Sequence, residues 1–140
     1  RINLIDWINI ETGEHYMIGN ILYNIKKNLG NGIAIVAIQK AEGAEAGRGG
    51  QFTKDFADLE LLIDRFGATG DVLLTIGKCK ESINKPCPGR TFAYMIGNGV
   101  EILKFREVRK CEACHGKGWV KSGNNNVPCT SCYKTGYVDK

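Results

Sequence analysis

Four cysteines in the last thirty residues of the chain have the spacing of a metal site. They form two Cys-x-x-Cys pairs separated by fourteen residues, at Cys111, Cys114, Cys129 and Cys132. Each pair presents two thiolates to one ion, and two pairs complete a closed, tetrahedral site of the structural zinc type. Two disulfides are the alternative, which is disfavoured because the rest of the chain is typical of an intracellular protein. We therefore expect these four cysteines to hold a structural Zn²⁺ ion.

Three other residues could take part in metal or thiol chemistry. His115 directly follows Cys114 and could replace a ligand, although a histidine in this place is more often a solvated neighbour. Cys79 and Cys87 lack a matching pair and are interpreted as unpaired thiols. Because the segment around the four cysteines contains almost no apolar core, we expect it to depend on the metal for folding.

The first cysteine pair resembles one repeat of the cysteine-rich region of the J-domain co-chaperones. Residues 111–118 match the pattern Cys-x-x-Cys-x-Gly-x-Gly, whereas residues 129–136 keep only its last glycine. The resemblance covers about 26 residues and implies a zinc hairpin that could bind nucleic acid or protein. A chaperone-like domain that binds unfolded polypeptide is a weaker alternative.

Two further candidate residues follow apolar runs near the N-terminus. Asp6 follows the run at residues 2–5, and Gln39 follows the run at 33–38, with a helical apolar pattern at 17–29 between them. A strand, a helix and a strand in this order predict two parallel, neighbouring strands whose carboxyl ends meet at one sheet edge. Asp6 could hold Mg²⁺ there and Gln39 could orient a water or sense a phosphate. In the alternative interpretation, Asp6 only terminates its strand.

These segments, with the glycine-rich loop at residues 39–53, resemble the C-terminal half of a RecA-like ATPase. The relatives implied are the hexameric replicative helicases of the DnaB type and their phage counterparts. The resemblance implies that Asp6 is the Walker B acid, that Gln39 is the phosphate sensor, and that a DNA-facing loop contains Arg48, Gly49 and Gly50. The loop could equally be a disordered linker instead of a DNA-facing loop.

The same resemblance assigns basic groups to a neighbouring subunit's nucleotide. Lys78 and Lys80 occupy the place of the family's Lys-x-Arg motif, and Arg90 is a substitute because lysine cannot form a bidentate fork. Either lysine could instead be a solvated strand residue. No Gly-x-x-x-x-Gly-Lys-[Ser/Thr] phosphate loop occurs in the sequence. We therefore expect Mg²⁺ and ATP only in a complete ATPase, and an isolated chain without activity.

The expected fold is α/β: the C-terminal half of a RecA-like, mainly parallel sheet with an antiparallel hairpin, followed by a small zinc ribbon. Candidate strands lie at 59–63, 72–76, 92–96 and 100–105, and Asn98 and Gly99 predict the hairpin turn. The expected domains are residues 1–107 and 108–140. In these 140 residues, 43% are apolar, 24% are charged, and no apolar run approaches 18 residues, so a membrane span is not expected.

Charge is concentrated at the C-terminal end. Residues 109–140 contain six basic and two acidic side chains, which gives the +4 that is also the net charge of the whole chain. This excess favours a polyanionic partner, and Lys117 and Lys121 are the expected contacts to DNA. The favoured function is thus part of a helicase ATPase, forming a homo-oligomeric hexamer in the cytoplasm of a bacterium or a phage-infected host cell. The alternative is a non-enzymatic, zinc-dependent module that binds nucleic acid or protein.

Overall fold

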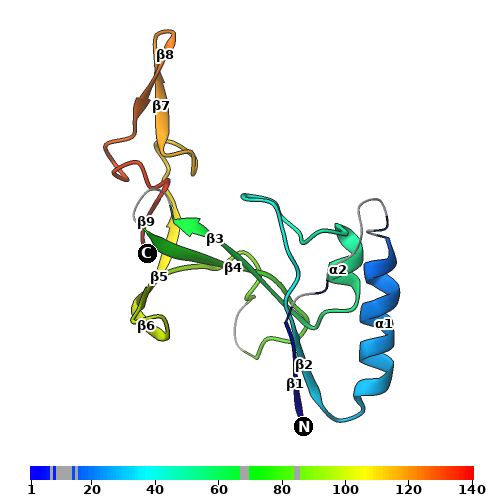
Figure 1. Cartoon of the computed structure of the whole chain (residues 1–140). Coiled ribbons are helices and arrows are strands. Elements are labelled where there is room, and N and C mark those ends of the chain that lie inside the picture. The colour runs from blue at the N-terminus through cyan, green and yellow to red at the C-terminus, as the bar shows by residue number, and fades with distance from the viewer. Residues whose placement is uncertain (7, 9–13, 15, 67–69, 84–85) are drawn as a thin grey trace. The chain divides into compact units, whose positions relative to one another are not determined.

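The computed structural model describes residues 1–6, 8, 14, 16–66, 70–83 and 86–140. Of these residues, 41% lie in strands and 14% in helices. The elements, labelled in Figure 1, are β1 (Ile2–Ile5), α1 (Met17–Leu29), β2 (Ile33–Val36), α2 (Gln51–Asp55), β3 (Leu59–Phe66), β4 (Asp71–Cys79), β5 (Thr91–Gly97), β6 (Glu101–Lys110), β7 (Trp119–Ser122), β8 (Asn125–Pro128) and β9 (Tyr137–Asp139).

The N-terminal strand, helix and strand form the expected parallel unit. β1 and β2 pair in parallel, with Ile2 opposite Ile33 and Ile5 opposite Val36. Ile18 of α1 is 1% exposed, and the apolar residues at helical spacing from it, Ile21, Leu22, Ile25 and Leu29, are partly buried. The helix ends at Gly30, which adopts a φ of 58° that favours glycine. The prediction of two neighbouring parallel strands joined by a helix is confirmed.

The larger sheet shows that the predicted RecA-like fold class is wrong. Its five strands have the order β3-β4-β5-β6-β9, and the β4–β5, β5–β6 and β6–β9 pairs are antiparallel. β1 and β2 form a separate two-stranded sheet. A parallel sheet needs a long crossover for each added strand, whereas no described residue between β3 and β9 is helical. The protein is therefore mostly β, with only two helices among its described residues.

The hairpin turn between β5 and β6 is confirmed at Asn98 and Gly99. These residues have φ values of 49° and 78°, and the Val100 N–H donates to the Gly97 carbonyl over 3.0 Å. Two successive positive φ values give the turn type whose twist matches that of antiparallel strands.

The chain divides by its internal contacts into two compact units. Unit 1 is Arg1–Glu60 with Gly77–Ile83, and unit 2 is Leu61–Ile76 with Asn84–Lys140. The core of unit 2 contains Phe66, Leu73, Ala93 and Val108, with Tyr137 packed against it. This division differs from the expected one, and whether residues 108–140 form a separate domain stays a prediction. Among the described residues, no helix has the length and apolar character needed to cross a membrane.

Candidate metal centre

The four predicted cysteines lie together in unit 2, within the segment 110–139, here called the cysteine module. Their sulfur atoms all lie within 4.8 Å of one another, and each residue is only 2–3% exposed. The Cys111 and Cys129 sulfurs are 3.9 Å apart, and those of Cys114 and Cys132 are 3.7 Å apart. A tetrahedron of sulfurs bound to zinc at about 2.3 Å has edges of about 3.8 Å. The four thiols are free rather than disulfide-bonded, and their spacing could hold a metal ion.

The cysteine module contains two similar halves, residues 111–118 and 129–136, which hydrogen-bond to each other. The Cys111 N–H donates to the Gly136 carbonyl over 2.8 Å, and the equivalent bond from Cys129 N–H to Gly118 is 2.9 Å long. Outside these halves, β7 pairs with β8 and β6 pairs with β9, so Trp119 faces Pro128 and Tyr137 faces Lys110. The two halves are therefore related by an approximate twofold arrangement with the cysteines at its centre.

Gly118 and Gly136 allow the two halves to approach closely. A Cβ on Gly118 would lie 2.3 Å from the carbonyl oxygen of Lys134, and one on Gly136 would lie 2.4 Å from that of Gly116. Both glycines also have positive φ values, 76° and 79°. The second half keeps the same path although Lys134, with a φ of 70°, stands where the first half has Gly116.

Backbone amides favour the ionised form of one thiol in each half. The Gly118 N–H donates to the Cys114 sulfur over 3.3 Å, and the Gly136 N–H donates to the Cys132 sulfur over 3.2 Å. Burial raises the pKa of the Cys114 thiol, but the Gly118 amide and the neighbouring thiols outweigh it and lower this pKa to about 7. Burial dominates at Cys132 and, with the neighbouring thiols, raises its pKa to about 11. Four adjacent thiolates are therefore unfavourable without a cation to compensate their charge.

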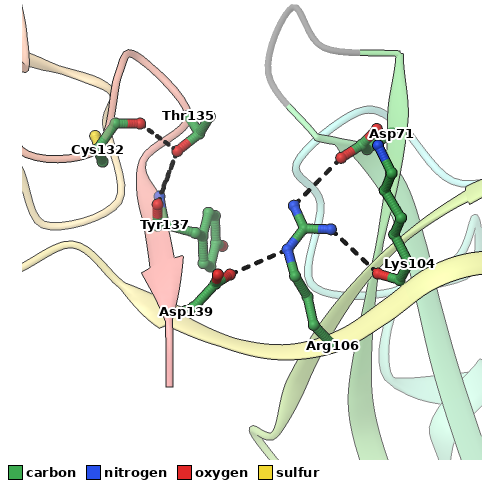
Figure 2. A network of polar contacts seen from close by, with 7 residues as sticks. All are labelled: Asp71, Lys104, Arg106, Cys132, Thr135, Tyr137 and Asp139. Carbon is green, nitrogen blue, oxygen red and sulfur yellow. Dashed lines mark hydrogen bonds and ion pairs between the residues drawn. The ribbon is translucent and has the colours of Figure 1, made fainter.

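The cysteine module is attached to the large sheet at both ends. β6 leads into the first half, and β9 returns from the second half to pair with β6 through Val108, Arg109 and Lys110. The hydroxyl of Thr135 lies 2.6 Å from the Cys132 carbonyl oxygen and 2.8 Å from that of Tyr137. Figure 2 shows Thr135 between these two residues. Thr135 therefore links the second cysteine pair to β9.

A guanidinium group fixes the position of β9 on the sheet. Arg106 of β6 donates to Asp139 over 3.0 Å, to Asp71 over 3.3 Å and to the Lys104 carbonyl over 3.2 Å, as Figure 2 shows. It also lies over the ring of Phe66. The side chain of Asp71 is only 10% exposed, so this network ties β4, β6 and β9 to the core.

Three acidic groups in or next to the cysteine module already have basic partners. Glu112 pairs with Arg109 at 2.6 Å, and Asp139 pairs with Arg106. Glu107 binds Arg90 and Lys140. Four exposed lysines of the module make no ion pair with any residue that the structure describes: Lys110, Lys117, Lys121 and Lys134.

His115 lies outside the thiol cluster and is exposed, in a turn where its φ is 52°. Sequence reasoning did not identify Thr135 or the contacts of Gly118 and Gly136. An available signal was the pattern Cys-x-x-Cys-x-x-x-Gly, which recurs after 18 residues.

The residues predicted to bind magnesium and nucleotide lie in unit 1. Asp6 follows β1 directly and Gln39 lies three residues beyond the end of β2; both are exposed. The Gln39 carbonyl accepts the Arg48 N–H over 2.8 Å, so the loop folds back onto the end of β2. Arg48 is exposed, and Gly49 and Gly50 immediately precede α2. No group of metal-ligating side chains among the described residues includes Asp6. A role for these residues in binding nucleotide or DNA stays a prediction.

The three basic residues assigned to a neighbouring subunit's nucleotide, Lys78, Lys80 and Arg90, each have a partner within their own unit. Lys78 donates to the carbonyls of Lys54 and Asp55 at the end of α2. Lys80 lies 3.6 Å from Asp58, whose pKa is lowered mainly by a hydrogen bond from Lys26.

Arg90 donates to both carboxylate oxygens of Glu107 over 3.1 and 3.0 Å. The hydrogen bonds from Arg90 and Lys140 lower the pKa of Glu107 to about 2.

In comparisons with known proteins, no family model, curated sequence or solved structure matches this chain. The resemblances to helicases and to co-chaperones therefore stay predictions, and the geometry of the cysteine module carries the functional argument.

Proposed function

We propose that the cysteine module is a zinc-stabilised module that binds nucleic acid. The observation that carries this proposal is the group of four buried thiols, which lie within 4.8 Å of one another and include two sulfur pairs at the 3.9 and 3.7 Å expected of a tetrahedral thiolate site. Soft thiolates in tetrahedral geometry suit Zn²⁺, and four protein ligands leave no open position for catalysis. The metal therefore has a structural role, and function belongs to the surface that it holds in place.

The charge of that surface supports a polyanionic partner. Lys110, Lys117, Lys121 and Lys134 are exposed, and the neighbouring carboxylates pair with other basic groups. When lysines without ion pairs contact phosphates, counterions condensed on the nucleic acid are released. The affinity for nucleic acid therefore falls steeply as the salt concentration rises. The same four lysines would add little binding free energy to a complex with an apolar partner.

Metal analysis and oligonucleotide binding test both parts of the proposal. We expect about one zinc per chain, and we expect Cys111→Ser to lose both the metal and the binding of DNA. Cys87→Ser is the matched control, because Cys87 lies in the same unit outside the thiol cluster. Lys121→Gln should retain zinc and reduce the slope of log affinity against log salt by about 1. A zinc-loaded chain without salt-dependent binding would contradict the proposal.

A second proposal concerns unit 1, which would supply Asp6 and Gln39 to a larger magnesium-dependent ATPase. It is supported by the parallel pairing of β1 and β2, since both exposed side chains follow the carboxyl ends of these strands. In the complete ATPase, Asp6→Ala should abolish ATP hydrolysis and leave the fold intact, as judged by circular dichroism. Unchanged hydrolysis would leave Asp6 with no more than a strand-ending role.

A further inference from the structure

We infer that the cysteine module binds single-stranded nucleic acid, and that Trp119 and Tyr133 stack against its bases. This inference rests on the proposed function and names the form of nucleic acid that the module selects. It comes from two large aromatic side chains left accessible on a surface of unpaired lysines.

Both aromatic side chains remain accessible to solvent, unlike aromatic side chains that pack in a core. Tyr133 is 86% exposed and Trp119 is 37% exposed, although the cysteines beside them are almost fully buried. Phe66 and Tyr137 contact each other near the core of the same unit, at a ring separation of 5.9 Å. Tyr133 and Trp119 make no ring contact with another aromatic residue that the structure describes.

The backbone brings the two aromatic positions to one place on the cysteine module. Trp119 follows Gly118, Tyr133 precedes Lys134, and the Gly118 backbone lies against the carbonyl of Lys134. The close backbone contact between the two halves therefore sets the spacing of Trp119 and Tyr133.

Cations flank these aromatic positions. The Lys117 ammonium lies 5.3 Å from the centre of the Trp119 ring, and Lys121 and Lys134 are exposed nearby in sequence. A base stacked beside a lysine brings its own phosphate within reach of that lysine. Aromatic side chains combined with a basic surface are the usual arrangement for binding single strands.

A duplex cannot use this arrangement in the same way. Its bases are stacked on one another, so a protein reaches only their edges and the phosphates. Unpaired bases expose their faces to aromatic side chains, and this stacking is tolerant of sequence. The lysine contacts should therefore contribute to the affinity for both forms, whereas the aromatic contacts should contribute only to the affinity for the single strand.

The test compares a fluorescent oligothymidine with a duplex of equal length, by anisotropy on the zinc-loaded chain. We expect tighter binding of the single strand. Tyr133→Asn and Trp119→Val should each weaken it at least about fivefold while leaving duplex affinity unchanged. Asparagine is chosen because it tolerates the φ of 50° at position 133. The zinc content of each variant shows whether the cysteine module is folded. If Trp119→Val loses zinc, the result for Tyr133→Asn alone decides the test.

Two control variants separate stacking from charge and from general exposure. Tyr16→Ala removes another exposed tyrosine, 62% exposed and located in unit 1, and should change neither affinity. Lys121→Gln should weaken the single strand and the duplex by similar factors, because it acts on phosphates.

The possible failures of the two proposals are distinguishable. Equal affinity for both forms, or aromatic variants that bind the single strand like the unmodified chain, would overturn this inference and leave the proposed function standing. A zinc-loaded chain that binds neither form would overturn both. Binding of a reduced, unfolded polypeptide in place of either oligonucleotide would also overturn both and favour a chaperone-like role.

Discussion

Replacing Gly118 by alanine would place a methyl group 2.3 Å from the carbonyl oxygen of Lys134. The clash would involve backbone atoms, so no side-chain rotation could relieve it. The two halves of the cysteine module would have to separate by about 1 Å to reach an ordinary contact of about 3.5 Å. This movement would act on the group of four thiols, because Gly118 also hydrogen-bonds to Cys114 and Cys129.

The expected cost of Gly118→Ala has two parts. A non-glycine residue at a φ of 76° costs about 1–2 kcal/mol. Weakening the bond from the Gly118 amide to the Cys114 sulfur and the bond from Cys129 to the Gly118 carbonyl costs about 1 kcal/mol each. The sum is about 3–4 kcal/mol. Because metal binding and folding are coupled in such modules, this loss should be measured as lost zinc affinity.

Gly123→Ala is the matched control for the backbone term. Gly123 also has a positive φ, 59°, but a Cβ there would meet nothing within 4 Å. Zinc affinity is measured by competition with a chromophoric chelator. Gly118→Ala should bind zinc about thirtyfold more weakly than Gly123→Ala, which corresponds to the remaining 2 kcal/mol or so. Equal affinities in the two variants would refute the argument that close approach of the two halves positions the thiols.

Three other predictions concern backbone strain, pH and catalysis. Lys134→Gly should raise the unfolding free energy of the zinc-loaded chain by about 0.5–1 kcal/mol in urea titrations. The strain energy removed at the positive φ of this position exceeds the entropic cost of ordering a glycine. A lower unfolding free energy would contradict this prediction. Because the folded pKa of Glu107 is lowered to about 2, its pairing stabilises the fold fully above the usual pKa of 4.5, and this stabilisation is lost as the pH falls toward 2. The stability difference between the unmodified chain and Glu107→Gln, measured by denaturant unfolding at several pH values, should shrink over that interval, and a constant difference would count against the pairing. A coupled-enzyme assay on the isolated chain should detect no magnesium-dependent ATP hydrolysis, because the sequence has no phosphate loop; sustained turnover would disprove this.

The positions of many elements could be predicted from local sequence signals. Apolar residues at helical spacing located α1, and Asn98 with Gly99 located the turn between β5 and β6. The Cys-x-x-Cys spacing identified the four residues that the structure brings together. The helix and turn signals work because the interacting groups are close in sequence, whereas the two cysteine pairs, 18 residues apart, were joined by the four ligands that a structural zinc ion requires.

The arrangement of the sheet could not be predicted in the same way. The β1–α1–β2 unit suggested a mainly parallel sheet, but alternation along a strand does not specify its neighbour. The partners of single side chains could not be predicted for the same reason. Arg90 binds Glu107 because the β5–β6 register places Phe92 opposite Glu107, and its expected role at a nucleotide stays a prediction.

The sequence by itself identified the four cysteines that lie together and the excess of lysine around them. Only the tertiary structure decided that Gly118 and Gly136 lie against backbone carbonyls of the opposite half, and that Arg106 ties β9 to the sheet. Ligand spacing is a local property of the chain. Contacts between segments 16 or more residues apart depend instead on strand pairing, which involves the free energy of the whole fold.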